Sequence, residues 1–271
     1  MSKNKIIKKV NTYNKLGSIL GASKLKVLHQ LFNIKKAATH NHMLALLSKK
    51  IFEHAKNNMN FDSEIYSNNF NSGKDINIMF ISENQTLSHA SERTISSFLK
   101  NKNDNDFNII VSDSKNEDER LKDFRLVNIE TLISLSYEIN HRYVSKKYDR
   151  VNIYSSLSEE GKYNTILPMI KLNENVEFKY KNLINKQTKF SPSVDLIIEK
   201  SYLDYVSGLL KYYYIYGKYT DLKNTLLKHE TSITHIEDNL EDLNKKLNKI
   251  RKSKITQDIL LAHEGAGGDN D

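Results

Sequence analysis

The sequence predicts an α/β protein in which a long antiparallel coiled coil of N- and C-terminal helices carries a small α/β domain with a largely parallel sheet. Proline occurs only twice in 271 residues, and apolar residues recur at helical spacing towards both ends. Short apolar runs alternate with helical segments between these ends. We place the N-terminal coiled-coil helix at 1–58, the α/β domain at 75–185, the C-terminal coiled-coil helix at 192–262 and a flexible tail at 263–271.

The expected N-terminal helix is amphipathic and carries charge of one sign. Its apolar positions, mostly three or four apart, are Ile6, Val10, Tyr13, Leu16, Leu20, Val27, Leu31, Ile34, Ala38, Leu44, Leu47 and Ile51. Many lysines but no Asp or Glu lie between Met1 and Lys50, which indicates an acidic partner such as phosphates, lipid headgroups or an acidic protein surface. A transit peptide is an alternative that the absence of Arg disfavours. Gly17 and Gly21 lie on one helix face, which favours close approach of a second helix or a partner loop.

The middle of the chain alternates between strands and helices. Apolar runs at Ile76–Ser82 and Phe107–Asp113 predict two buried strands, and the segments FRLVNIE and DRVNIYSSL predict two more. Helical spacing follows in TLSHASERTISSFLKN and ETLISLSYEINHRYVSKK. NTILPMIKL fits an edge strand because Pro168 is tolerated there. This alternation predicts a largely parallel sheet.

Motifs for catalysis or cofactor binding are missing from the sequence. The turn after the first expected strand has no glycine, and no G-x-x-x-x-G-K-[ST] occurs. The chain has no Cys, His40 and His42 do not share a helix face, and the acidic run at 117–119 fits a solvated helix start better than a metal site. We therefore expect a non-catalytic chain without a cofactor or a metal.

The C-terminal helix carries a coiled-coil seam. Two interleaved series with a period of seven residues comprise Leu226, Ile233, Leu240 and Leu247, and His229, Ile236, Leu243 and Ile250, with only His229 not apolar. A helix from 194 to 262 would be roughly 100 Å long and would need a second helix to cover the seam. The N-terminal helix is the only other long one, so we expect the two to wind antiparallel. The aromatic run KYYYIYGKY fits packing better than a base-stacking platform.

Specific motifs stand near both ends of the chain. VNTYNKLGSILGASKLK contains the run Ala22–Leu25. In NKIRKSKITQDILLAHEGAGG the informative residues are Asn248, Lys249, Arg251, Ile255, Thr256, Gln257, Asp258, Gly265 and Ala266. With YDRVNIYSSL, ILPM and SPSVDLIIEKSYLDYV in order between them, the chain resembles the gamma subunit, the central stalk, of F-type rotary ATPases over nearly its whole length.

The resemblance implies a non-catalytic rotor inside a hexamer of alternating alpha- and beta-type subunits, whose rotation is coupled to ATP hydrolysis or synthesis in the beta-type partners. It implies hexamer contacts at Lys8, Lys9, Lys15, Gly17, Leu20, Ser23, Lys24, Arg251, Lys252, Thr256, Gln257 and Asp258. It further implies an epsilon-type subunit and a membrane ring at the α/β base. We expect a cytoplasmic protein that is peripheral to the membrane through this complex, because no apolar run approaches the roughly 18 residues of a membrane span.

Three departures from the family pattern bear on what the rotor drives. Leu261 stands where the family has an acidic residue, ENQTLSHASE replaces a glycine-rich turn, and the chain ends in Gly-Gly-Asp-Asn-Asp. In the family the α/β base meets the epsilon-type subunit and the ring, so the altered turn puts coupling to a proton ring in question. This leads to the hypothesis of a specialised F-type-like ATPase, in an AT-rich and wall-less bacterium, that drives another machine such as one for gliding motility.

Two other classes of function are compatible with parts of the sequence. A nucleic-acid-binding coiled-coil protein would account for the basic N-terminal part, although no base-reading module is visible and we expect no nucleic-acid partner. A structural coiled-coil interaction protein would account for the seam. Neither accounts for the C-terminal motif.

Overall fold

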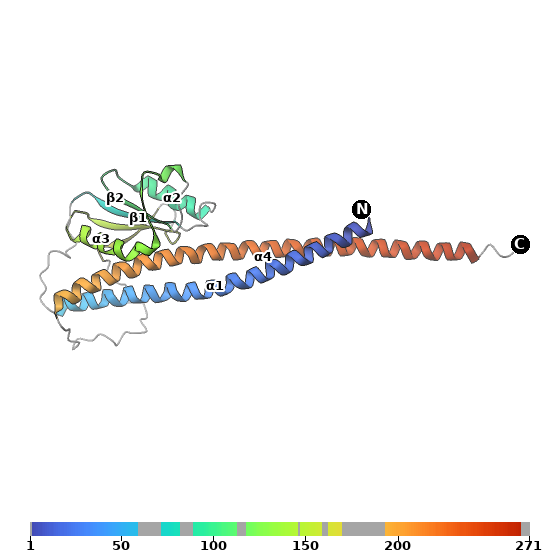
Figure 1. Cartoon of the computed structure of the whole chain (residues 1–271), viewed down its shortest axis with the longest axis horizontal. Helices are drawn as coiled ribbons and strands as arrows, with labels where there is room; N and C mark the ends of the chain where they lie inside the picture. Colours follow the sequence, from blue (N-terminus) through green and yellow to red (C-terminus); the bar gives the residue numbers. More distant parts are fainter. Residues whose placement is uncertain are drawn as a thin grey trace. The chain divides into compact units, whose positions relative to one another are not determined.

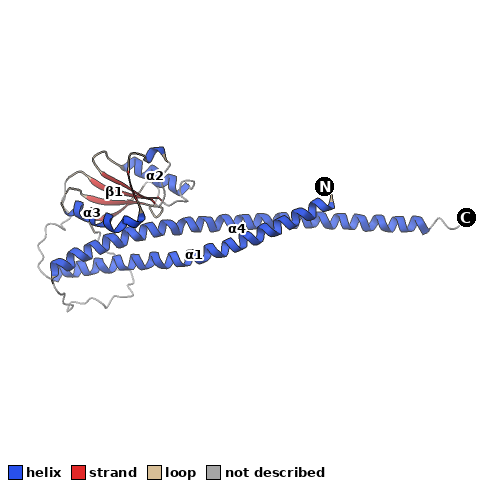
Figure 2. Cartoon of the chain, in the orientation of Figure 1, coloured by secondary structure: helices blue, strands red, loops and turns tan. Residues whose placement is uncertain are grey.

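The computed structural model describes residues 2–58, 72–81, 89–112, 118–145, 147–158, 162–169 and 193–266. Two long helices, α1 (Lys3–Asn58) and α4 (Val194–Ala266), flank the smaller elements in the sequence (Figures 1 and 2). The chain divides into two compact units, one formed by Met1–Leu31 with Leu222–Asp271 and the other by Phe32–Asp221. Each unit contains a part of both long helices. We call the first the paired-helix unit and the second the sheet unit.

The sheet unit holds every strand of the described chain. Its smaller elements are β1 (Asp75–Ile81), α2 (His89–Asn101), β2 (Phe107–Ser112), the 3-10 turns η3 (Glu119–Leu121) and η4 (Ile129–Thr131) around β3 (Arg125–Val127), α3 (Leu132–Val144), β4 (Arg150–Tyr154) and β5 (Asn164–Leu167). The strands lie in the order β3-β2-β1-β4-β5. All neighbours are parallel except β4 and β5, which are antiparallel. The expected α/β class with a largely parallel sheet is therefore confirmed.

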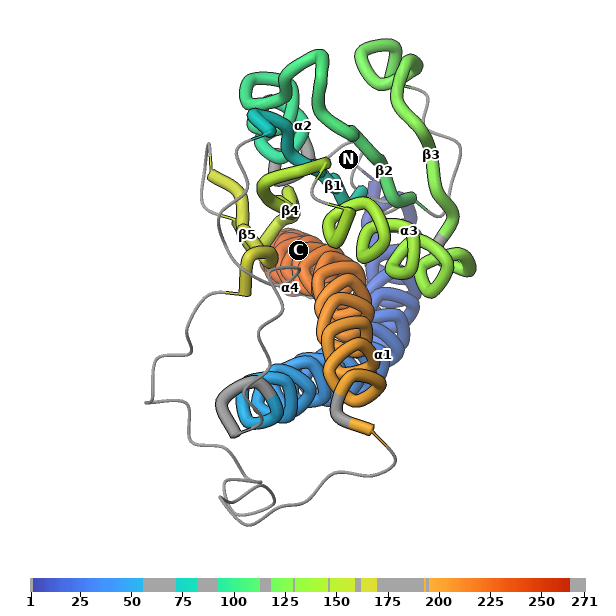
Figure 3. The backbone as a smooth tube through the Cα atoms, turned by 90° about the vertical axis from the view of Figure 1, so that its left-hand side faces the viewer, coloured from blue at the N-terminus to red at the C-terminus, as the bar shows by residue number. Residues whose placement is uncertain are grey.

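Helices cover both faces of the sheet. One face packs on α2, where Met79, Ile110 and Tyr154 meet Ile95 and Phe98. The opposite face packs on α3 and on the first part of α4, and residues of α1 that pack against α4 join the same core. Figure 3 shows α2 and α3 on opposite sides of the strands. The strands are consequently buried on both faces, which is why they read as continuous apolar runs in the sequence.

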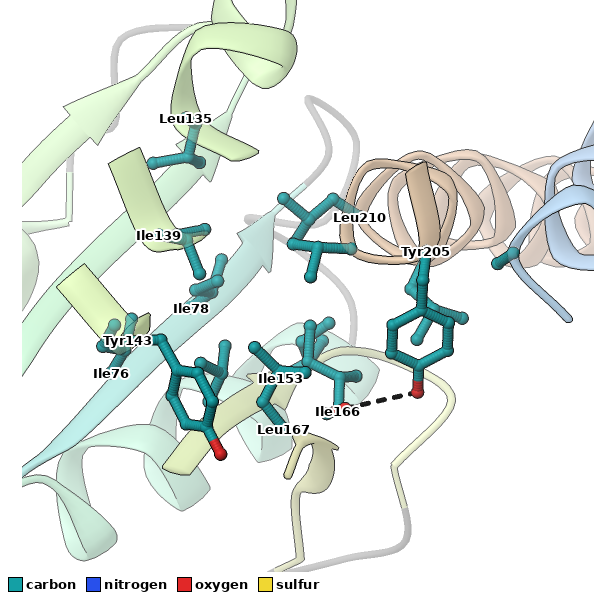
Figure 4. Close-up of a cluster of buried hydrophobic side chains, with 14 of the residues drawn as sticks. Ile76, Ile78, Leu135, Ile139, Tyr143, Ile153, Ile166, Leu167, Tyr205 and Leu210 are labelled. Atoms are coloured by element: carbon teal, nitrogen blue, oxygen red, sulfur yellow. Dashed lines mark hydrogen bonds between the residues drawn. The ribbon is translucent and has the colours of Figure 1, made fainter. Parts of the chain in front are cut away.

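The larger core joins the sheet to the first part of α4. Figure 4 shows side chains of β1 and α3 lying together with Leu210 and Tyr205 of α4. The hydroxyl of Tyr205 donates a hydrogen bond to the carbonyl oxygen of Ile166, with 3.2 Å between the oxygens. This bond satisfies a buried hydroxyl and ties α4 to strand β5.

A row of polar side chains crosses the face of the sheet that α2 covers. Asn152 donates to the side-chain oxygen of Asn77 (3.1 Å), and Asn77 donates to that of Asn108 (3.0 Å). Thr165 donates to Asn152 at 2.9 Å, which extends the row to β5. Asn77 and Asn152 are buried, so a shift of strand register would leave their amides unpaired. The row therefore favours a single register between β2, β1, β4 and β5.

The two long helices run antiparallel within the sheet unit and approach closely at one point. Phe52 and His42 of α1 contact Tyr202 and Tyr212 of α4, with ring centroids 5.6 Å and 4.5 Å apart. Between these contacts, a Cβ built on Gly208 would lie 3.0 Å from the Cβ of Ala45 and 3.2 Å from its backbone nitrogen. A side chain at this position would require Ala45 of α1 to shift by a few tenths of an ångström, so Gly208 permits the short distance between the helices.

Two residues of the expected apolar face of α1 lie elsewhere. Leu16 and Leu44 are exposed, whereas Ile6, Val27 and Ala38 of the same face are buried. Steps of three and four residues allow more than one apolar stripe on a helix, and α4 covers only one of them.

We predict that alanine in place of Gly208 and alanine in place of Gly21 change the free energy of unfolding in opposite directions. Gly208→Ala should lower the free energy of unfolding by about 1–3 kcal/mol, because the backbone of α1 blocks the new methyl group. Gly21→Ala should raise it by about 0.5–1 kcal/mol, because a Cβ there meets no atom within 4 Å and alanine favours helix. Denaturant unfolding of both variants tests this. Stabilisation by Gly208→Ala would contradict the close approach.

A second prediction concerns alkaline pH. Burial raises the pKa of Tyr143 to about 12 from its usual 10.0, with the charge of Asp149 as a smaller cause. The folded protein thus holds this proton more tightly than the unfolded chain, so the stabilisation is complete below pH 10 and is lost as the pH approaches 12. Circular dichroism and tyrosinate absorbance should show unfolding in this window.

Variants separate this effect from general alkaline damage. Tyr143→Phe should move the alkaline unfolding midpoint to higher pH, because it removes one of several buried tyrosine hydroxyls whose pKa is raised by burial. Tyr137→Phe removes the hydroxyl of an exposed tyrosine and should leave the midpoint where it is. Equal midpoints for all three proteins would contradict the assignment to Tyr143.

Candidate functional site

Three contacts fix how α1 and α4 pair within the paired-helix unit. A Cβ built on Gly17 would lie 3.7 Å from a methyl carbon of Ile236. Further along α1, the Ser23 hydroxyl lies 3.1 Å from Nε2 of His229, and Lys24 Nζ lies 3.0 Å from a carboxylate oxygen of Glu230. From Gly17 to Lys24 the residue numbers on α1 rise by seven, while those of their partners on α4 fall from 236 to 230. The helices are antiparallel, as the fold class requires.

The expected seam residues lie on the side of α4 that faces α1. Ile236 and Leu243 are buried, and the half-buried residues are Leu226, Ile233, Leu240, Leu247 and Ile250. His229 is half-buried as well, and its ring nitrogen reaches Ser23. From α1, Ile6 and Val27 are buried in the same unit.

The expected contact residues of α1 fall into two groups. Lys8, Lys9 and Lys15 are exposed. Gly17, Ser23 and Lys24 instead contact α4 of the same chain, and Leu20 is half-buried. Antiparallel pairing places this second group beside the seam, so only part of each side chain remains open to another molecule.

Gly21, the other glycine of α1 in this unit, has open space beside it. No atom lies within 4 Å of the position that a Cβ would occupy. The expected close approach of a second helix is thus seen at Gly17, at van der Waals distance, and not at Gly21.

Beyond the seam, α4 continues without cover from the described residues. Every residue from Arg251 to His263 is exposed. The expected contact residues in this stretch, Arg251, Lys252, Thr256, Gln257 and Asp258, therefore all face solvent. Thr256 donates a hydrogen bond to the carbonyl oxygen of Lys252 at 3.0 Å, within the helix. We call residues 251–263 the uncovered end.

Large apolar side chains make the uncovered end unusual for a solvated helix. Their exposed fractions are Ile255 58%, Ile259 57%, Leu260 56% and Leu261 65%. Surface helices normally turn such residues towards a core, and a contiguous exposed apolar surface marks an interaction site. Ile259 and Leu260 were not among the residues expected at the site. The signal for them is the run ILLA at 259–262, beyond Ile250, where the heptad pattern stops.

A second exposed apolar pair lies on α1. Leu25 and Leu28 are exposed, and they follow Gly21 at helical spacing, so the three share a stripe that does not face α4. Neither leucine was expected at a site. Their three-residue spacing was the available signal.

Among the described residues, no group of three or more His, Asp or Glu side chains could hold a metal ion. His42 stacks on Tyr212, and burial lowers its pKa. Asp118 pairs with Arg120 at 2.7 Å, and this hydrogen bond lowers the pKa of its carboxyl.

Several expectations from the sequence concern residues that the structure does not describe. Residues 83–88 of the segment ENQTLSHASE lie outside the described ranges, whereas its last four residues belong to α2. Glu117 of the acidic run and the C-terminal Gly-Gly-Asp-Asn-Asp at 267–271 lie outside them as well. The helix α4 itself extends to Ala266, into the stretch assigned to the tail. None of the described helices has the length and apolarity to cross a bilayer.

Comparison with known proteins gives structural similarity only. No family model matches the chain, and no curated protein matches its sequence. Its fold is similar to a chain of the Euglena gracilis mitochondrial ATP synthase rotor, with 11% identity, a TM-score of 0.38 and coverage of 87% of this chain and 99% of the other. It is also similar to a chain of the OSCP/F1/c-ring assembly of the same enzyme, with 12% identity, a TM-score of 0.36 and coverage of 93% and 97%.

Proposed function

We propose that this chain is the gamma-type rotor shaft of an F-type or F-type-like ATPase, turning inside a hexamer of alpha- and beta-type subunits. The observation that carries the proposal is the uncovered end of α4. A helix that leaves its partner helix and then exposes Ile255, Ile259 and Leu261 needs another molecule to cover them. A ring of subunits around the helix would cover all of its sides at once.

The position of the sequence motif supports this role independently. The residues that carry the resemblance at the C-terminal end include Arg251, Thr256 and Gln257, and all three lie in the uncovered end. A motif that served the coiled coil would be expected at the seam. No other part of the described chain covers this motif. A motif for partner recognition has to be accessible in this way.

The proposed mechanism assigns no chemistry to this chain. ATP would be hydrolysed or made in the beta-type subunits, and the shaft would transmit rotation through the paired helices. Lysines such as Lys8, Lys9 and Lys15 would attract an acidic collar without fixing a register, because charge attraction is long in range and weakly directional. This suits a surface that has to slide.

The driven machinery is assigned to the sheet unit. In this proposal the sheet unit meets either an epsilon-type subunit with a membrane ring or another machine, such as one for motility. The protein would then be cytoplasmic and peripheral to the membrane through its complex. The exposed side chains of Ile133 and Tyr137 on α3 are the apolar surface available for such a contact.

Copurification from native cells tests the complex. We expect alpha- and beta-type ATPase subunits to accompany the chain in one large assembly with ATPase activity. Recovery of the chain with nucleic acid, or as a pure chain without nucleotide-binding subunits, would refute the proposal.

Variants of the uncovered end test the bearing contact. Ile255→Ser with Ile259→Ser should lower the yield of assembled complex and its ATP turnover at least several-fold, because two apolar contacts are lost. Leu227→Ser is a matched control, since Leu227 is 52% exposed on the same helix but lies in the paired stretch. Equal assembly of both variants would argue against a bearing at this end.

A reversible cross-link adds a test of rotation. The chain has no cysteine, so Ser253→Cys introduces a single thiol on the uncovered end. A disulfide to a cysteine in the hexamer should stop ATP turnover, and reduction should restore it. Full turnover in the oxidised complex would contradict a rotating shaft.

A further inference from the structure

The seam between α1 and α4 contains one polar layer. It consists of the Ser23–His229 contact at 3.1 Å and the neighbouring Lys24–Glu230 ion pair at 3.0 Å. His229 occupies a position that the heptad pattern reserves for an apolar residue. A polar residue at such a position costs stability, and it is tolerated best opposite a group that can bond with it. Ser23 of α1 supplies that group.

Charge along the two helices is complementary in the same region. On α4, residues 229–244 contain no Lys or Arg, and their acidic residues are Glu230, Glu237, Asp238, Glu241 and Asp242. The contacts at Gly17 and Lys24 place this stretch beside about residues 9–24 of α1, which contain Lys9, Lys15 and Lys24 and no acidic residue. Across the seam, Lys24 of α1 pairs with Glu230 of α4, whereas Glu241 pairs with Lys245 of α4 itself.

A second copy of α4 is the obvious competitor for this seam. Apolar residues repeated every seven positions are self-complementary, so two copies of α4 could pair in parallel through Leu240, Leu243 and Leu247. Such a pair would set His229 against His229 and one acidic stretch against the other. Neither the imidazole nor the carboxylates would find the partners that α1 offers.

We propose that the polar layer, formed by the Ser23–His229 contact and the Lys24–Glu230 ion pair, directs the seam of α4 to helix α1 and excludes a second copy of α4. Stability is given up at one position of the seam so that only one partner fits it. A protein that acts through a single helical pair needs such a device, because an apolar seam alone does not choose between α1 and α4. The proposal does not depend on the rotary function.

A single reporter cysteine distinguishes the two pairings. Leu247→Cys lies on the seam, so in a parallel α4 pair it would face its own copy and form an interchain disulfide. In the α1–α4 pair, and in a dimer that exchanges α1 between chains, the two thiols lie apart. Lys246→Cys, which is off the seam, reports non-specific cross-linking in the same full-length chain.

The layer is then removed by His229→Leu with Ser23→Leu. We expect the Leu247→Cys reporter to give no interchain disulfide above the Lys246→Cys level in the natural background. The leucine background should give at least several-fold more of it and concentration-dependent dimers in sedimentation. His229→Asn, which keeps a polar group opposite Ser23, should behave as the natural chain does.

Two results would overturn the proposal. One is the absence of interchain Leu247→Cys disulfide in a folded leucine variant at every concentration. The other is abundant disulfide already in the natural background.

If the leucine variant does not fold, a second pair of variants decides. Glu230→Lys should weaken pairing with α1 and lower the unfolding midpoint in denaturant, because it replaces the ion pair with Lys24 by a repulsion. Adding Lys24→Glu should restore much of it. A failure of the second exchange to restore the midpoint would refute the role of the charges.

Discussion

The structure depends on covering the apolar surface of one helix. Helix α4 spans 73 residues, and such a helix is held in place by packing of its apolar side. Its surroundings change along its length. Up to Tyr214 it packs on the sheet and on α1, from Leu226 to Ile250 it faces α1, and from Arg251 to His263 nothing in the described chain covers it. The proposed contact with driven machinery concerns the first of these stretches, the choice of α1 as partner concerns the second, and the proposed bearing concerns the third.

The sequence was informative wherever one face of an element had one neighbour. The seven-residue period predicted the pairing of α4, because α1 covers a single narrow stripe over that stretch. The buried face of α1 was harder to predict, since Leu16 and Leu44 have the spacing of a buried stripe but are exposed. Burial at each turn of α1 depends on where α4 lies, and the spacing of apolar residues in α1 does not record that.

The row of polar side chains across the sheet corresponds to a repeated pattern in the sequence that was not part of the prediction. Three strands each contain one asparagine between apolar residues, in the runs INI, FNI and VNI at Asn77, Asn108 and Asn152. Because parallel neighbours align in register, the asparagines meet. The Ser23–His229 contact was less accessible, since its members lie 206 residues apart and only the register of the two helices brings them together.

The pairing of α1 with α4 stops at the start of α1, because the register of the two helices places Lys3 opposite about Ile250. Basic residues of both helices gather at this point. After Asn244 the sequence of α4 turns basic, with Lys245, Lys249 and Arg251, while the facing start of α1 carries Lys3 and Lys5. Like charges then oppose each other, and Ile6 is the buried apolar residue that holds this turn. An anionic neighbour would relieve the repulsion of both helices here, at the point where the apolar side chains of the uncovered end also need a partner.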